Sequence, residues 1–397
     1  MTARREITKK YARAYQRADK PEKSRLLDAL VETTGWTRDH ARRAIHAALA
    51  RKGAASQQQR RLRPRKYSYD ALVVLQEVWR LAGQPSGTYL AAIMDDTLDR
   101  LIRFRELGKV GSRVAPGVLD ELLAMSPATI DRYLKPHKDA QYPVALSGTK
   151  PSHILRSSIP VRTAMDGTPN EPGFYELDTV AHCGHTLKGE HLWTLTATNP
   201  QYGWTMLRTV KNKAYANVKP ALDWIKRNTP TPVTAVDFDN GSEFLNWSVI
   251  AWLDEREIDV TRGRPYQHND NAHVEQRNGD WVRKHAFRYR YEGEDEMRLL
   301  NELWQLVMLR KNHLLPCVKA SGWKHTPAGR KQRVYDKPRT PYQRLLDAKV
   351  LDAKTAARLA QIHEGLNPAK ITRRINKIQL ELIQLAAART QANHSAV

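Results

Sequence analysis

The stretch FYELDTVAHCG, residues 174–184, alternates apolar and polar side chains with the period of a β-strand. Two further alternating runs follow it, HLWTLTATN at 191–199 and YGWTMLRTV at 202–210, separated by turns that carry Gly and Pro. Short connections favour antiparallel pairing of successive strands. The three runs therefore predict a three-stranded meander, with Asp178 inside its first strand, where an unpaired carboxylate is costly.

The chain after the meander changes to alternating helix and strand signals. The expected elements are a helix at 215–228, a strand at 233–238, a helix at 242–257, a strand at 258–263 and a helix at 269–287. The order βββαβαβα is that of RNase H-like folds, in which a mixed five-stranded sheet brings the first and fourth strands side by side. We therefore expect acidic residues at the ends of these two strands to meet.

Three carboxylates stand at positions that this arrangement would bring together. Asp178 lies in the first strand, Asp239 in VDFDNGSEF at 236–244, and Glu275 in RPYQHNDNAHVEQRN at 264–278. Carboxylates about 4 Å apart repel one another by roughly 4 kcal/mol per pair at an effective dielectric near 20, so a cation must offset the repulsion. Mg²⁺ prefers hard oxygen ligands, and two such ions support phosphodiester cleavage. The three acids therefore predict a site for two Mg²⁺ or Mn²⁺ ions.

Two neighbouring acids compete with this assignment. Glu176 lies two residues before Asp178, and Asp237 lies two residues before Asp239, so strand alternation puts each pair on one face. Asp239 is favoured because it begins a tight DNG turn at the open end of its strand. Geometry alone does not exclude Glu176 in place of Asp178.

The motifs around two of the acids carry a family resemblance. DNGSEF at Asp239 and RPYQHNDNAHVEQRN at Glu275 resemble the integrase-core signatures of bacterial insertion-sequence transposases, which belong with the retroviral-type integrases to the DDE group. Thirty-five residues separate Asp239 from Glu275, which agrees with that group. The resemblance covers 169–292. It implies that Asp178, Asp239 and Glu275 bind the metal ions and catalyse donor-strand cleavage and strand transfer.

The sequence departs from the retroviral members in one respect. They carry a zinc-binding His/Cys domain, and the two cysteines of this chain, Cys183 and Cys317, cannot supply its ligands. The departure favours a transposase over a retroviral enzyme. His182 and Cys183, which follow the first strand, are expected to line the site or the core and not to bind zinc.

The charge of the chain indicates its partner. A formal net charge of +23 over 397 residues favours a polyanion, and nucleic acid is the first choice. Two segments, one broken at Gly35 and one before Ser126, show a helix, a short turn and a second helix with basic side chains, which is the helix-turn-helix outline. The residues expected to contact DNA are Arg38, Arg42 and Arg43 in the first segment, Arg63 and Arg65 in a basic linker, and Thr129 and Arg132 in the second segment. A later basic group is also expected to contact phosphates, namely Arg283, Lys284, Arg288 and Arg290.

The sequence predicts a multidomain chain. The expected parts are a helix-turn-helix domain at 1–50, a basic linker at 51–66, a second helix-turn-helix domain at 67–138, a linker at 139–168, the α/β RNase H-like catalytic core at 169–292, a helix with a basic, turn-rich segment at 293–345 and a helical region at 346–397. In the last region five residues keep the spacing of a coiled-coil seam, Ile371, Ile375, Ile378, Leu382 and Leu385. That seam would serve packing on the same chain as well as dimerisation.

The leading interpretation is a transposase that binds terminal inverted repeats and target DNA as a homo-oligomer, with the need for a helper ATPase left open. An RNase H-like nuclease without joining activity and a domesticated helix-turn-helix regulator are the alternatives. No run of about 18 apolar residues and no secretory signal are visible, so we expect a cytoplasmic, nucleoid-associated protein without a membrane span.

Overall fold

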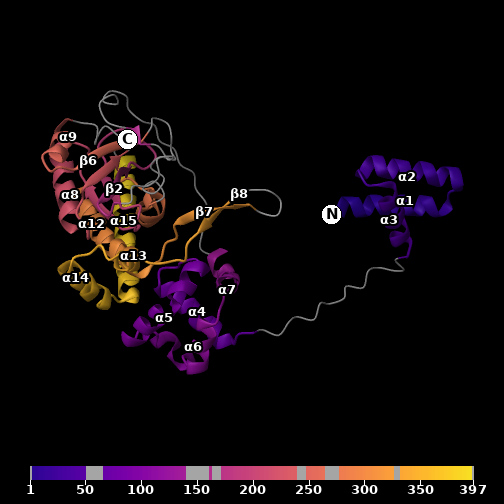
Figure 1. The fold of residues 1–397 in the computed structure, drawn as a ribbon, viewed down its shortest axis with the longest axis horizontal. Helices are drawn as coiled ribbons and strands as arrows, with labels where there is room; N and C mark the ends of the chain where they lie inside the picture. The colour runs from indigo at the N-terminus through magenta and orange to yellow at the C-terminus, as the bar shows by residue number, and fades with distance from the viewer. Residues whose placement is uncertain are drawn as a thin grey trace. The chain divides into compact units, whose positions relative to one another are not determined.

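The structure is a computed structural model that describes residues 2–50, 66–139, 161–162, 171–238, 247–263, 277–325 and 331–395. The chain forms two compact units, Met1–Lys66 and Tyr67–Val397, whose elements are drawn in Figure 1. Four residues of the predicted sites lie outside the described residues: Arg63, Arg65, Asp239 and Glu275.

The first unit is a small helical bundle. Its helices are α1 (Thr2–Arg17), α2 (Lys20–Thr34) and α3 (Arg38–Ala50). Gly35 ends α2 in the left-handed conformation, with φ of 68°, which a residue without Cβ adopts at no steric cost. The Thr37 hydroxyl accepts the N–H of His40 at 3.3 Å and caps α3. Ala41 and Ile45 are fully buried, as the pattern of α3 predicts.

The second unit begins with a larger helical segment. Its elements are α4 (Tyr69–Leu81), α5 (Gly87–Arg103), the 3₁₀ helix η1 (Gly108–Arg113), α6 (Pro116–Leu123) and α7 (Pro127–Asp139). The segment packs on the C-terminal helices: Thr372 Oγ1 donates to the Leu81 carbonyl at 2.8 Å, and Arg373 pairs with Glu106 at 2.7 Å. The helices predicted at 67–138 are therefore present, but they share one unit with the rest of the chain.

The centre of the second unit is a mixed sheet. Its strands are β1 (Val161–Arg162), β2 (Phe174–Ala181), β3 (Trp193–Thr198), β4 (Thr205–Val210), β5 (Ala235–Phe238) and β6 (Asp259–Gly263), in the order β1-β6-β5-β2-β3-β4. β2, β3 and β4 pair antiparallel, whereas β5 pairs parallel with both β2 and β6. The five expected strands and the neighbouring first and fourth strands are confirmed. The sheet also has a sixth, two-residue strand, β1, inside the segment predicted as a linker.

Helices cover both faces of the sheet. Tyr175 and Leu177 of β2 face an apolar layer built by α8 (Tyr215–Asn228) and α9 (Trp247–Asp254), where they meet Leu222 and Trp252. The opposite face, which carries Glu176 and Asp178, is covered by α12 (Glu294–Leu309). This mixed sheet with helices on both faces is compatible with an RNase H-like fold.

Two segments differ from the predicted helices and turns. The described part of the helix expected at 269–287 consists of a π-helical segment η2 (Asn278–Arg283) and one turn α11 (Lys284–Ala286). The helix expected to begin this region ends in a second π-helical segment, η3 (Arg310–Leu314), and the turn-rich segment that follows contains a β-hairpin of β7 (Ala320–His325) and β8 (Lys331–Tyr335). π-Helical turns occur frequently at functional sites.

The chain ends in three helices, α13 (Pro341–Ala348), α14 (Ala353–Glu364) and α15 (Pro368–Ser395). Ile371, Ile375, Ile378 and Leu382 of α15 are buried in the same apolar cluster as the sheet, and α15 packs on α12. The coiled-coil seam predicted from the sequence therefore packs within its own chain. Among the described helices, none is long and apolar enough to cross a membrane.

Candidate active site

The candidate site lies within β2, where its pairing with β5 ends. Asp178 is half-buried there, and its Oδ1 accepts the N–H of Thr179 at 2.7 Å. On the neighbouring parallel strand, Phe238 pairs with Leu177. That pair stands one residue before Asp178 on β2 and one residue before Asp239 on the other strand, although Asp239 itself lies outside the described residues.

Asn278 connects the segment after Glu275 to Asp178 of β2. Its Nδ2 donates a hydrogen bond to Asp178 Oδ2. Asn278 is buried, and its Oδ1 has no hydrogen-bond partner among the described residues. Asn278 follows Glu275 by three residues, and residues three apart on a helix share a face. The side chain was not singled out from the sequence, and that spacing is the signal that would have found it.

The two competing acids lie deeper in the sheet than Asp178. Glu176 is 1% exposed, Asp237 is fully buried, and the two are register partners on β2 and β5. Asp237 Oδ1 also accepts a hydrogen bond from Thr261 Oγ1 on the next strand. Because a substrate or hydrated ion reaches a half-buried carboxylate more readily than a fully buried one, the geometry favours Asp178 over Glu176.

A chain of hydrogen bonds fixes the acidic face of the sheet to α12. Trp304 Nε1 donates to Thr209 Oγ1 at 2.7 Å, Thr209 and Thr194 are joined through their hydroxyls at 2.9 Å, and Thr194 contacts His182 Nε2 at 2.7 Å. Burial lowers the pKa of His182 to about 3, so its imidazole is neutral. Trp304 is the donor to Thr209, and the two threonine hydroxyls connect it to Nε2 of His182. His182 is thus a core residue of this face.

Charged side chains of η3 contact both η2 and the turn α11 that follows it. Lys311 of η3 forms an ion pair with Asp280 of η2, and Arg310 Nη2 donates to His285 Nε2 at 2.5 Å. Since arginine has no acceptor, Nδ1 carries the His285 proton and donates to the Trp281 carbonyl at 2.6 Å. Burial lowers the pKa of Lys311 to about 8, and the Asp280 carboxylate acts in the opposite direction.

The low pKa of Lys311 predicts a pH-dependent stability. Its ordinary pKa is 10.5, so between about pH 8 and pH 10.5 the unfolded chain binds more protons than the folded chain, and stability rises with pH. The cost of the buried ammonium is fully present below pH 8. We expect Lys311→Met to raise the unfolding free energy at pH 7 by about 1–3 kcal/mol, and this gain to shrink as the pH approaches 10.5.

Urea unfolding across that pH range measures the difference between variant and wild type. Lys354→Met is the control, because Lys354 is exposed on α14 and its replacement should leave the pH profile unchanged. A Lys311→Met gain that stays constant from pH 7 to pH 10.5 would contradict the assigned pKa.

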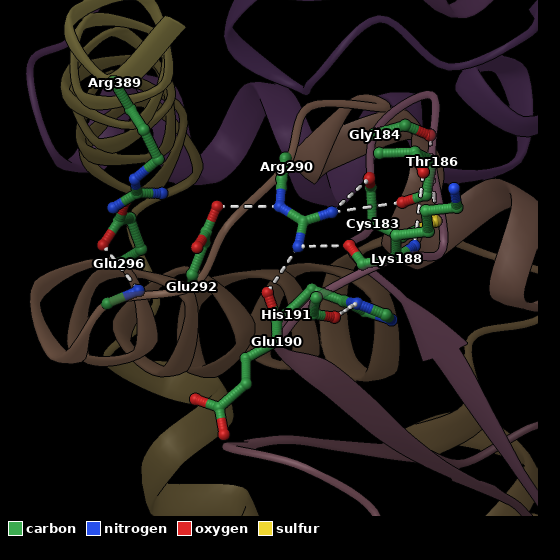
Figure 2. A network of polar contacts seen from close by, with 12 residues as sticks. Cys183, Gly184, Thr186, Lys188, Glu190, His191, Arg290, Glu292, Glu296 and Arg389 are labelled. Carbon is green, nitrogen blue, oxygen red and sulfur yellow. Dashed lines mark hydrogen bonds and ion pairs between the residues drawn. The ribbon is translucent and has the colours of Figure 1, made fainter. Parts of the chain in front are cut away.

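Arg290 organises the loop that joins β2 to β3. Figure 2 shows its guanidinium directed into the loop, where it donates to the carbonyl oxygens of four loop residues. The acceptors are Cys183 at 3.3 Å, Thr186 at 3.1 Å, Lys188 at 2.9 Å and Glu190 at 2.7 Å. Its Nε also donates to Glu292 Oε1 at 2.7 Å. The geometry therefore gives Arg290 a structural role, unlike the phosphate contact expected from the sequence.

The basic side chains of α3 differ in their surroundings. Arg38 forms an ion pair with Asp28 and donates to Ser24 Oγ at 2.5 Å, which ties α3 to α2. Arg43 pairs with Asp39 at 3.1 Å on the solvent side of the helix. Arg42 is exposed and has no hydrogen bond or ion pair within the described part of the unit. The DNA contacts expected from all three stay predictions.

The two residues of α7 that are expected to contact DNA, Thr129 and Arg132, also differ in their surroundings. The Thr129 N–H donates to Ser126 Oγ at 3.4 Å and the two hydroxyls lie 3.0 Å apart, so Thr129 belongs to the start of the helix. Arg132 is exposed, with its guanidinium carbon 5.4 Å from the ring centre of Tyr133. Arg132 is therefore the more accessible of the two.

The residues around Asp178 suit a hard divalent cation. A carboxylate oxygen is the kind of ligand that Mg²⁺ takes, and the unpartnered Oδ1 of Asn278 adds a buried oxygen beside Asp178. Within the described ranges, no three His, Cys, Asp or Glu side chains gather as a metal site. Two of the three expected ligands, Asp239 and Glu275, fall outside those ranges.

The chain is similar to proteins that are already known. No family model matches it. It is 32% identical over 323 residues to the uncharacterized protein y4rM of Sinorhizobium fredii (strain NBRC 101917 / NGR234), a match that covers 80% of this chain and 88% of that protein. Among solved structures it is similar to the catalytic core domain of BIV integrase, with 14% identity and a TM-score of 0.31 over 45% of this chain and 97% of that one.

Proposed function

The chain belongs to the same family as y4rM of Sinorhizobium fredii, and we propose that it is a DNA transposase that cuts and joins strands at a site built on Asp178, Asp239 and Glu275. The observation that carries the proposal is the hydrogen bond from Asn278 to Asp178. It links the first strand to the segment that follows Glu275, as a joint site of the three acids requires. The parallel register of Leu177 and Phe238 supports the same convergence for Asp239.

Asp178, Asp239 and Glu275 would hold two Mg²⁺ or Mn²⁺ ions, which supply an activated nucleophile and stabilise charge on the leaving oxygen. The chain's own groups orient the first of these ligands. The Thr179 N–H and the Asn278 amide each donate to one Asp178 oxygen, so the carboxylate has a defined rotamer before DNA arrives. Such preorganisation avoids part of the cost of ordering the site during the reaction.

The charge of the chain supports DNA as the substrate. The formal net charge of +23 favours binding to the phosphate backbone, and exposed arginines on α3 and α7, Arg42 and Arg132, are available for it. We propose that unit one and the α6–α7 segment contact the terminal inverted repeats. Joining two ends requires a complex that holds both, so we also propose a homo-oligomer on DNA, with the dependence on a helper ATPase to be measured.

An in vitro assay with DNA carrying the element's ends, a supercoiled target and Mg²⁺ tests the proposal. We expect covalently joined products with the wild-type chain and none when EDTA replaces Mg²⁺. Cleaved but unjoined DNA would identify a nuclease, and DNA binding without cleavage would identify a regulator. Either result would overturn the transposase assignment.

A further inference from the structure

The hairpin of β7 and β8 stands apart from the fold around it. Every residue of β7 from Ala320 to His325 is exposed, and Figure 1 shows the ribbon projecting away from the sheet and its covering helices. A two-stranded hairpin with no covering layer is marginally stable in water. The ribbon therefore presents both faces to a partner or to solvent.

One face of the ribbon carries aromatic and basic side chains. Trp323 is opposite Arg333 in the register, with the guanidinium carbon 5.3 Å from the ring centre of Trp323. His325 and Tyr335, each two residues along its own strand, share this face by the alternation of a strand. Trp323 is 62% exposed and Tyr335 is 53% exposed. We call these four residues the ribbon face.

The base of the ribbon is held firmly against the catalytic sheet. Lys319 Nζ donates to the carbonyl of Gln201, in the turn between β3 and β4, at 2.6 Å. Asp336 pairs with Arg344 at 2.6 Å, and Arg344 also donates to the Cys317 carbonyl at 2.9 Å. The base of the ribbon is therefore fixed to the unit that carries Asp178, whereas β7 beyond this base is exposed.

The charge of the ribbon selects its partner. Between 319 and 337 the single acidic residue is Asp336, and Arg344 neutralises it at the root. A second copy of this chain carries the same net charge of +23 and would be repelled by a cationic face. The DNA major groove admits a two-stranded β-ribbon, and its phosphates attract flanking cations.

We propose that the β7–β8 ribbon is a duplex-DNA-binding arm, which inserts into a groove and contacts the backbone through the ribbon face. The inference rests on the proposed function for the identity of the nucleic acid as DNA. It adds a binding site beyond the helical segments and the acidic site. Because the root is fixed to the sheet, the arm would hold the duplex at a set distance from Asp178.

The test measures binding of the full chain to a labelled duplex of mixed sequence by fluorescence anisotropy, in EDTA and at several salt concentrations. Trp323→Ala and Arg333→Ala should each weaken binding by about tenfold. Arg333→Ala should also reduce the slope of log affinity against log salt by about one. Arg358→Ala, which removes an exposed arginine from α14, is the matched control and should bind like wild type.

Three outcomes would contradict the proposal that the ribbon is a DNA-binding arm. The two variants could bind the duplex like wild type at every salt concentration, or lose affinity for a single-stranded probe alone. They could also change the particle mass in light scattering without a change in DNA affinity, which would identify a protein interface. Thermal unfolding should be unchanged in both variants, since the side chains are exposed.

The joining assay keeps this inference separate from the proposed function. If the wild-type chain binds the duplex but joins no ends, the transposase proposal is contradicted and the proposal of a DNA-binding arm still stands. If the wild-type chain joins ends and both Trp323→Ala and Arg333→Ala bind the duplex normally, only the proposal of a DNA-binding arm is contradicted.

Discussion

Asp178→Asn is expected to reduce strand transfer by about a hundred- to a thousandfold, the order of loss that follows removal of a group stabilising developing charge. The amide is nearly the same size as the carboxylate and keeps one oxygen for the Thr179 N–H. Its NH2 group would face the Asn278 amide, which can turn its unpartnered Oδ1 toward it, so β2 should fold as before. The substituted amide lacks the negative charge with which the carboxylate attracts a divalent ion. The measurement is the yield of joined product with Mg²⁺, alongside DNA affinity, which should be unchanged.

Two further variants sharpen that result. Asp254→Asn alters an exposed carboxylate at the end of α9 and should join DNA at the wild-type rate. Glu176→Gln alters the buried neighbour on β2, and its folded fraction should retain joining activity. Full activity of Asp178→Asn together with inactivity of folded Glu176→Gln would transfer the metal-binding role to Glu176.

Trp304→Ala is expected to destabilise the second unit by about 3–5 kcal/mol, the usual cost of emptying a buried aromatic site. Trp304 has no exposed surface in the apolar cluster beneath the sheet. Its indole N–H is also the donor that starts the chain through Thr209 and Thr194 to His182. Urea unfolding followed by circular dichroism measures the loss.

Trp323→Ala supplies the matched control for this prediction. The same substitution on the exposed ribbon removes a side chain that is 62% accessible, so the unfolding midpoint should hardly move. Equal destabilisation by both substitutions would mean that Trp304 is not the anchor between α12 and the sheet.

The sheet could be predicted because its strands alternate strongly. Leu177 and Val180 face opposite layers with polar residues between them, and the meander needs only short turns, so local pattern and topology agree. The pairing of the first and fourth strands followed from the order of elements. The two-residue β1 escaped prediction because two residues show no period.

The contacts around the site were harder to predict. Arg290 resembles any basic residue near a DNA site, yet four carbonyl oxygens of a loop far away in sequence satisfy its guanidinium. Asn278–Arg283 is π-helical and its Asp280 contacts Lys311 of η3, neither of which the helical pattern of its own residues encodes. Tertiary contacts thus determine the roles of Arg290 and Asp280, which local propensity does not predict.

The burial of the α15 seam has a consequence for the order in which the two units fold during synthesis. Ile375, Ile378 and Leu382 share one apolar cluster with Leu177 and Phe238 of the sheet, so that cluster closes only when nearly the whole chain has been synthesised. The first unit, by contrast, builds its bundle from Met1–Lys66 alone. At translation rates of about 5–20 residues per second the two events are separated by roughly tens of seconds. On the proposed function, a chain still on the ribosome would acquire its DNA-reading unit well before it could cut.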